Sequence, residues 1–184
     1  MHVLANADGK TTMKKAEQKM MLCNGNEAAA QAIIDIKYDG EGYFPITPSS
    51  EVGESVSKAV AEGKSDISFV VGTSELAAIG ICTGMALAGG RVVDVTSAQG
   101  LLLKVEELPS ISGLGLSMVL NPSTREVNAP LNIKNGHSDL AATLGMGWLT
   151  FMAPNVQAVY DMNIIALKVA EAVGLPAIVA YDGF

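Results

Sequence analysis

The chain has 184 residues, of which 49% are hydrophobic and only 17% are charged. This length and composition fit one folded domain and exclude disorder over most of the chain. Lysine and arginine number 12 against 19 aspartates and glutamates, which gives a net charge of −7 without any run of basic residues. This acidic balance argues against a nucleic-acid-binding surface.

Cysteine usage and hydropathy indicate the compartment. Cys23 and Cys82 have no metal-ligand spacing, so we expect free thiols in a reducing cytoplasm, with any iron–sulfur cluster held by another segment or chain. The longest charge-free stretches, 76–90 and 108–124, are shorter than the ~20 residues that span a bilayer. We therefore expect no membrane association, a polar tail over residues 1–20 that is not a signal peptide, and a folded domain over 21–184.

Past the tail, apolar runs typical of strands alternate with helix-like segments. Strands such as ISFVV and AIVAY are apolar throughout, as they are when helices cover both faces of a parallel sheet. The alternation predicts one α/β domain with a doubly wound, mostly parallel sheet. In chain order, the predicted elements are a helix over 27–38, a strand over 43–47, a helix over 50–62, a strand over 67–72, a helix over 74–88, a strand over 91–96, a helix over 98–108, a strand over 116–120, a helix over 139–146, a strand over 148–153, a helix over 156–173 and a strand over 177–181.

The turns that leave the predicted strands are rich in polar side chains. They have the sequences FPITPSS, VGTSE, VTSAQG, LNPSTR and NIKNGHSD. In open α/β sheets, ligands bind at the carboxyl ends of the strands, so these turns suit a polar small molecule. Ser, Thr and Asn also occur there as helix caps, and no Walker or GxGxxG phosphate motif is present.

Two residues of these turns have both a functional and a structural interpretation. Thr47 lies between two prolines that favour extended backbone. Its hydroxyl could orient an oxoacid carboxylate or carbonyl, or Thr47 could belong to a turn ahead of a Ser49 or Ser50 cap. Arg125 could bind a carboxylate through its forked guanidinium, or could be a solvated loop residue.

Glu75 opens the predicted helix over 74–88. A carboxylate in the first turn stabilises the helix dipole by ~0.3–1 kcal/mol, which is its structural interpretation. The rest of the helix carries no charge, which predicts burial nearly all round. Gly80, Gly84 and Ala88 recur at four-residue steps, which indicates that another backbone packs closely on that face. A lone acid at the start of such a helix is a candidate to act at an interface.

His137, Ser138 and Asp139 resemble a hydrolytic triad only superficially. Neighbouring residues cannot easily point at one another, and the chain has no GxSxG elbow. Asp139 is predicted to be the N-cap of the helix over 139–146. Asp182 and Gly183 are not followed by residues that would complete a metal–diphosphate motif, so no metal ligand is assigned.

Taken together, FPITPSS, SELAAIG, TSAQGL, the Arg125 region, NIKNGHSD and the terminal YDGF resemble the pyruvate (2-oxoacid):ferredoxin or flavodoxin oxidoreductases. The similar part, from about residue 24 to residue 184, is the thiamine diphosphate pyrimidine-binding domain at the start of the α chain. The resemblance implies oxidative decarboxylation of a 2-oxoacid, with pyruvate as the expected substrate, to an acyl-CoA. Electrons would pass through iron–sulfur clusters to ferredoxin or flavodoxin.

The resemblance also implies roles for particular residues. Glu75 would be catalytic and cofactor-binding through a hydrogen bond to the aminopyrimidine ring nitrogen, which favours the imino tautomer that removes the thiazolium C2 proton. Thr47 and Arg125 would contact the oxoacid carboxylate. Only the pyrimidine end of the cofactor would be held here, with Mg²⁺ and [4Fe–4S] clusters on other domains or partner subunits.

The chain is therefore expected to be one part of an oligomeric complex and inactive alone. Two other hypotheses stay open: a non-catalytic assembly or regulatory module of the same fold, and half of another thiamine diphosphate enzyme.

Overall fold

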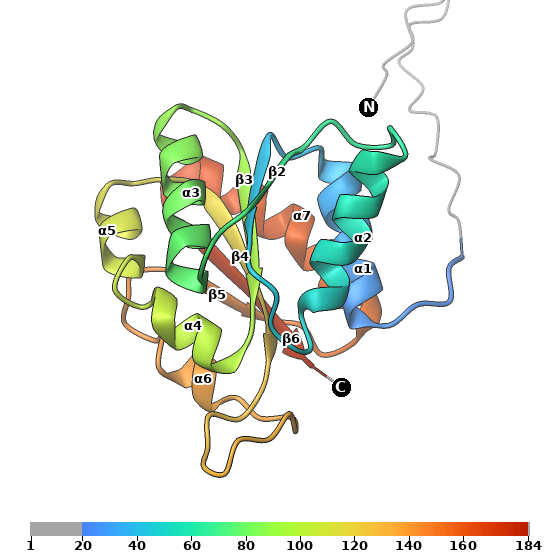
Figure 1. Cartoon of the computed structure of the whole chain (residues 1–184). Helices are drawn as coiled ribbons and strands as arrows, with labels where there is room; N and C mark the ends of the chain where they lie inside the picture. Colours follow the sequence, from blue (N-terminus) through green and yellow to red (C-terminus); the bar gives the residue numbers. More distant parts are fainter. Residues whose placement is uncertain (1–19, 184) are drawn as a thin grey trace, which may run out of the picture.

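The structure is a computed structural model that describes residues 20–183, so most of the expected tail lies outside the described residues. Helices and strands alternate along the chain (Figure 1). Their bounds are α1 (Gly25–Ile36), β1 (Gly40–Tyr43), α2 (Ser50–Ala61), β2 (Ser68–Val71), α3 (Glu75–Leu87), β3 (Val92–Thr96), α4 (Ala98–Lys104), α5 (Leu108–Gly113), β4 (Met118–Thr124), α6 (Ser138–Ala141), β5 (Leu149–Met152), α7 (Val156–Val173) and β6 (Ala177–Asp182).

The strands form one six-stranded sheet in the order β2-β1-β3-β4-β6-β5. Every pairing between neighbours is parallel. Helices α1, α2 and α7 cover one face of the sheet, and α3, α4 and α5 cover the other (Figure 1). The predicted doubly wound α/β fold is confirmed. The order of the strands reverses between β1 and β3, which makes this the switch point where such sheets bind ligands.

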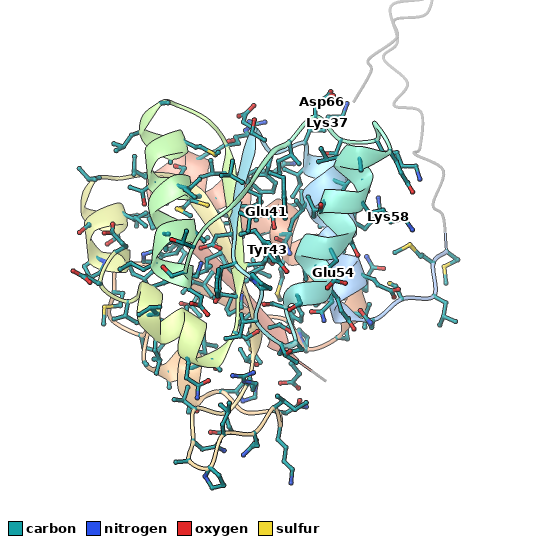
Figure 2. All side chains as sticks on the ribbon, viewed as in Figure 1. Lys37, Glu41, Tyr43, Glu54, Lys58 and Asp66 are labelled. Carbon is teal, nitrogen blue, oxygen red and sulfur yellow. The ribbon has the colours of Figure 1, made fainter. Side chains whose placement is uncertain are left out.

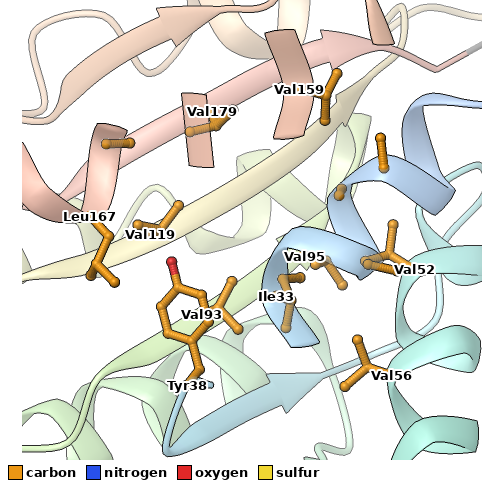
Figure 3. Packing of buried hydrophobic residues seen from close by; sticks show 14 of the residues in the cluster. Ile33, Tyr38, Val52, Val56, Val93, Val95, Val119, Val159, Leu167 and Val179 are labelled. Atoms are coloured by element: carbon orange, nitrogen blue, oxygen red, sulfur yellow. The ribbon is translucent and has the colours of Figure 1, made fainter. Parts of the chain in front are cut away.

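Aliphatic side chains fill the space between the sheet and each helical layer. Figure 3 shows the cluster under α1, α2 and α7, where Val93, Val119 and Val179 from neighbouring strands meet Ile33 and Leu167. A second cluster lies under α3, α4 and α5. In both clusters, apolar strand residues that the sequence predicts to be buried pack against apolar residues of the covering helices.

Strand β1 is the element whose position was predicted wrongly, since it covers Gly40–Tyr43 rather than 43–47. Its glycines lie directly beneath α3. A Cβ atom on Gly42 would collide with the carbonyl oxygen of Ala78, and one on Gly40 would collide with the sulfur of Met85. The close packing of α3 on the sheet therefore requires this glycine-containing strand, although glycine is a poor strand former.

Other predicted elements also differ in extent. The helix over 98–108 is two helices, α4 and α5, and Pro109 stands in the first turn of the second. The helix over 139–146 is a single turn, α6. Strand β2 lies at the edge of the sheet with Val70 and Val71 exposed, so helices do not cover it on both faces as predicted.

Glu41 is a buried acid in the middle of β1. It lies two residues from Tyr43, so both side chains point to the face under α1 and α2, where Figure 2 labels them. Glu41 is 0% exposed, and neither of its carboxylate oxygens has a hydrogen-bond partner among residues 20–183. Burial raises the pKa of Glu41 well above its ordinary value; the negative charge of Asp94 adds to the rise, and Lys104 opposes it. The buried environment therefore favours the protonated form of Glu41 in the folded protein.

This raised pKa makes stability depend on pH in a defined direction. The unfolded chain releases the Glu41 proton near pH 4.3, and the folded chain releases it at a higher pH. The stabilisation that comes from this proton is therefore complete below about pH 4.3 and is lost as pH rises. Replacing Glu41 with Gln is expected to remove this downward slope of the free energy of unfolding between about pH 5 and 8. Replacing Glu41 with Met should also remove the unsatisfied polar group and stabilise the protein at pH 7 by about 1–3 kcal/mol.

Urea denaturation across this pH range measures both effects, with Glu54→Gln on the exposed face of α2 as the control. If the free energy of unfolding of Glu41→Gln had the same pH slope as the parent, Glu41 would not retain its proton on folding.

Candidate functional site

The polar turns predicted to form a site lie at the carboxyl edge of the sheet, on both sides of the switch point between β1 and β3. Thr47 follows β1, Glu75 follows β2, Gln99 follows β3 and Arg125 follows β4. Because all these strands are parallel, their exits face the same edge. The fold therefore gathers residues that are up to 78 positions apart in the chain.

Glu75 is the first residue of α3 and is half-buried. The helix cap is made by the preceding residue, since the Ser74 hydroxyl accepts the Ala77 amide at 3.1 Å. Among residues 20–183, no hydrogen-bond partner is found for the Glu75 carboxylate. The carboxylate is thus not needed for the cap and is free to meet a ligand.

Gly100 of the TSAQGL motif makes room for Glu75. A Cβ atom on Gly100 would lie 2.9 Å from Glu75 Cγ, 3.0 Å from Glu75 Oε1 and 2.7 Å from Thr96 Oγ1. Real Cβ atoms do not approach other atoms so closely, so any larger residue at this position would displace the glutamate. The Thr96 hydroxyl is buried and has no hydrogen-bond partner in the part of the chain that the structure describes. The SELAAIG and TSAQGL motifs therefore meet at one point of the sheet edge.

Arg125 joins the exits of β1, β3 and β4. Its Nη1 donates to the Thr47 carbonyl oxygen at 2.6 Å, and its Nη2 donates to Gln99 Oε1 at 2.7 Å. The residue is only 5% exposed, so its interpretation as a solvated loop arginine is wrong. Burial lowers the pKa of the guanidinium and the charge of Asp139 opposes this, but an arginine stays charged in proteins. A fixed positive charge therefore lies at this edge.

Thr47 reaches this cluster through its backbone. Its carbonyl oxygen holds Arg125, while the residue as a whole is exposed. Ser49 precedes α2, but its hydroxyl donates to the Ile46 carbonyl at 2.9 Å and makes no cap bond. The predicted Ser49 cap is therefore absent, and the turn is held instead by Arg125 and by the Asn26 amide, which donates to the Pro48 carbonyl at 3.1 Å.

Sequence reasoning missed two parts of this arrangement. Gln99 was not singled out, although its position inside TSAQGL was a signal. Asp139 was predicted to be a helix N-cap, but His137 holds that position and Asp139 lies within the first turn of α6. Its carboxylate instead accepts backbone amides from Ala98 and Arg125, far away in sequence.

One face of α3 is uncovered in this chain, contrary to the burial predicted all round. We call it the uncovered α3 face: Gly80, Gly84, Leu87 and Ala88 are all exposed, with Leu87 61% exposed. No atom of another described residue lies within 4 Å of where a Cβ atom on Gly80 or Gly84 would be, apart from their chain neighbours and the helix's own backbone. An apolar face with so little side-chain bulk suits close packing by another chain or domain.

Within residues 20–183, no group of three or more His, Cys, Asp or Glu side chains is arranged to hold a metal ion. In the same part of the chain, no helix has both the length and the apolar character needed to cross a membrane.

The fold and site together define a parallel α/β domain that presents one free carboxylate and one buried arginine at its switch point. A sequence model described as "Pyruvate flavodoxin/ferredoxin oxidoreductase, thiamine diP-bdg" matches residues 31–184. The chain therefore belongs to this family and spans its thiamine diphosphate-binding domain.

Individual relatives support this family assignment. The chain is 42% identical over 161 residues to the pyruvate synthase subunit PorA of Pyrococcus furiosus, covering 86% of this chain and 41% of that one. It is 35% identical over 161 residues to the ketoisovalerate oxidoreductase subunit VorA of Pyrococcus abyssi, covering 88% and 41%. It is 36% identical over 169 residues to the alpha subunit of the NADH-dependent phenylglyoxylate dehydrogenase of Aromatoleum evansii, covering 91% and 40%. The chain thus spans about two fifths of the length of these relatives.

A solved structure has the same fold. The 2-oxoglutarate:ferredoxin oxidoreductase from Magnetococcus marinus, with 2-oxoglutarate, coenzyme A and succinyl-CoA bound, superposes with a TM-score of 0.78 at 25% sequence identity. The match covers 88% of this chain and 29% of that chain.

Proposed function

We propose that this chain is the pyrimidine-binding part of a 2-oxoacid oxidoreductase that converts a 2-oxoacid and coenzyme A to an acyl-CoA. Pyruvate is the first substrate to test, because the relatives include pyruvate synthase subunits. Electrons leave for ferredoxin or flavodoxin. Mg²⁺ and the iron–sulfur clusters are held by other domains or partner subunits, and the free thiols Cys23 and Cys82 are consistent with a cytoplasmic location.

The observation that carries this proposal is the Glu75 carboxylate, which lies beside Gly100 at the start of α3 and has no hydrogen-bond partner among residues 20–183. A carboxyl group in this position fits the aminopyrimidine ring of thiamine diphosphate, whose ring nitrogen needs a hydrogen-bonding acid. When bound, the cofactor supplies the electron sink for decarboxylation. Glu75 holds the pyrimidine in place and exchanges a proton with its ring nitrogen.

Arg125 acts on the substrate rather than the cofactor. Its guanidinium is fixed by Thr47 and Gln99 and needs no reorganisation to meet an anion. It binds the carboxylate end of the 2-oxoacid, with Thr47 alongside, and this orients the keto carbon toward the cofactor.

The direct test is the activity of the complete complex that contains this chain. Reduction of ferredoxin or flavodoxin is followed with pyruvate, 2-oxoisovalerate, 2-oxoglutarate and phenylglyoxylate, each with and without coenzyme A. We expect reduction that depends on both coenzyme A and one of these acids. A complex that binds thiamine diphosphate but reduces neither acceptor with any of them would favour a non-catalytic assembly module.

The uncovered α3 face is expected to be the surface for this assembly. Replacing Gly84 with Leu should leave the chain as stable as the parent or more stable by up to about 1 kcal/mol, since leucine is the better helix former and the space is open. The new side chain should prevent close approach and weaken binding to the partner chains. Sedimentation velocity of the mixed chains measures this.

The matched control is Ala172→Leu on the exposed side of α7. It adds the same side chain to a different surface, and we expect it to leave assembly unchanged. If the Gly84 variant assembled as tightly as the control, the contact would lie elsewhere on the molecule.

A further inference from the structure

Asp139 is a fully buried carboxylate that ties two strand exits together. It is 0% exposed, and its Oδ2 accepts the Ala98 amide at 2.8 Å and the Arg125 amide at 3.0 Å. Its Oδ1 accepts the amide of Leu140 at 2.8 Å. One oxygen atom therefore joins the chain leaving β3 to the chain leaving β4.

The two amides that meet on Asp139 belong to the residues that carry the candidate substrate site. Arg125 is one of them, and Ala98 directly precedes Gln99. The side chains of Gln99 and Arg125 then bond each other at 2.7 Å. The Asp139 carboxylate thus joins the backbones of Ala98 and Arg125, and the Gln99–Arg125 side-chain bond closes the ring. This ring of contacts sets the separation of Gln99 and Arg125.

Ala98 needs such a restraint. Its φ of 42° lies in the left-handed region, which costs a residue other than glycine about 1 kcal/mol or more. The hydrogen bond to the Asp139 carboxylate offsets this strain, because bonds to a charged acceptor are about twice as strong as neutral ones. Without it, the turn that presents Gln99 would relax.

The residues beside Asp139 hold it in place. His137 Nε2 lies 2.9 Å from Asp182 Oδ1 at the end of β6. The Ser138 hydroxyl accepts the Val127 amide at 2.8 Å and donates to Glu126 at 2.7 Å, just beyond β4. The segment 137–139 is therefore anchored to the same edge of the sheet from several strands.

We propose that Asp139 is a positioning residue for substrate binding: it sets the Gln99–Arg125 pair in the geometry that receives the oxoacid carboxylate, without touching the substrate itself. This inference rests on the proposed function, in which Arg125 binds that carboxylate. An asparagine at this position is a weaker replacement. If its one oxygen accepts the Ala98 and Arg125 amides, that oxygen is uncharged and the NH₂ group opposes the Leu140 amide.

The test compares Asp139→Asn with Arg125→Lys in the assembled enzyme. We expect both variants to raise the KM for the 2-oxoacid about tenfold and to change the KM for coenzyme A less than twofold. The control is Thr143→Val, which removes another buried hydrogen bond near α6, the one from Thr143 Oγ1 to the Leu140 carbonyl at 2.8 Å. This control should leave the KM for the oxoacid unchanged.

Amide hydrogen exchange supplies a readout that does not depend on turnover. The amides of Ala98 and Arg125 should exchange faster in Asp139→Asn and at the parental rate in Thr143→Val. If Asp139→Asn does not assemble, the same comparison is made between Ala98→Gly and Ala98→Gly/Asp139→Asn, because glycine adopts the left-handed conformation without strain.

The outcomes distinguish a failure of the positioning role of Asp139 from a failure of the proposed role of Arg125. A parental oxoacid KM in Asp139→Asn, or an equal rise in the KM for coenzyme A, overturns the positioning role. If Arg125→Lys also binds the oxoacid as the parent does, the assignment of Arg125 in the proposed function is wrong as well.

Discussion

Glu75→Gln is expected to lower turnover of the assembled enzyme by about 10²–10⁴-fold, which is the usual cost of losing a positioned acid–base group. The reason is chemical, since an amide cannot supply the acidic proton that the pyrimidine ring nitrogen requires. The stability of the chain should change by about 1 kcal/mol or less, because the favourable interaction of the carboxylate with the helix dipole is small and is opposed by its repulsion of Asp94. Turnover and thermal unfolding are measured on the same preparations.

The matched control for this prediction is Ser74→Ala. Ser74 makes the cap of α3, so its loss should destabilise the chain by about 1 kcal/mol while leaving the Glu75 carboxyl group in place. The two variants should therefore give opposite results. Glu75→Gln should lose turnover and keep normal stability, whereas Ser74→Ala should lose stability and keep its turnover. A Glu75→Gln enzyme within a few-fold of parental turnover would leave the carboxylate with a purely electrostatic role at the helix end.

The second large effect concerns an ion pair buried beneath the site. Lys104 Nζ, on α4, lies 2.5 Å from Asp94 Oδ2, on β3, and the two side chains are 1% and 0% exposed. Burial raises the pKa of Asp94 even though Lys104 lowers it, and the charge of Glu75 adds to the rise. Replacing Lys104 with Met is expected to lower the free energy of unfolding by about 3–5 kcal/mol, because the carboxylate would remain buried without its partner.

Replacing both members of the pair should reverse this loss. In Asp94→Leu/Lys104→Met, apolar side chains of similar size fill the space, and the free energy of unfolding should return to the parental value or rise above it. Urea denaturation of the chain at pH 7 measures both variants. A loss below about 1 kcal/mol in Lys104→Met would show that the two groups are neutral in the folded protein, so that no charge is left unpaired.

Elements with clear local signals were predicted well from the sequence. Helix α7 covers Val156–Val173, as predicted, because it has a signal at each end. The Asn155 side chain caps its first turn, and Gly174 takes the left-handed conformation that ends it. The turns after β2 and β3 were likewise found as polar segments, since each follows an apolar run. Most of the predicted turn LNPSTR instead lies within β4, and only Arg125 lies beyond the strand.

Strand β1 was misplaced because its residues give no local strand signal. The residues of β1 include the poor strand formers Gly40, Glu41 and Gly42. The strand was therefore predicted over the more apolar run 43–47 that follows. Pairing with β2 and β3 on both sides overrides this propensity. The uncovered α3 face was also misjudged, since an uncharged helix has the same sequence pattern whether it is buried in its own chain or against another.

The contacts that organise the site join residues far apart in the sequence, and no sequence pattern predicts them. Asp139 reaches Ala98 across 41 positions, and Arg125 reaches Gln99 across 26. A carboxylate at the start of a helix has the same sequence pattern whether it caps that helix or bonds distant amides. The resemblance to the family predicts Thr47, Glu75 and Arg125 as site residues, but it does not predict the residues that contact them.

Proton exchange at C2 of thiamine diphosphate bound to the assembled complex, followed in deuterated water without substrate, tests the role of Glu75 most directly. The parental complex should exchange this proton rapidly, and the Glu75→Gln complex should lose about 10²–10⁴-fold in rate although it still assembles and folds normally. Exchange at the parental rate in Glu75→Gln would contradict the assignment of Glu75 to the cofactor and, with it, the central claim that this edge of the sheet is a thiamine diphosphate site.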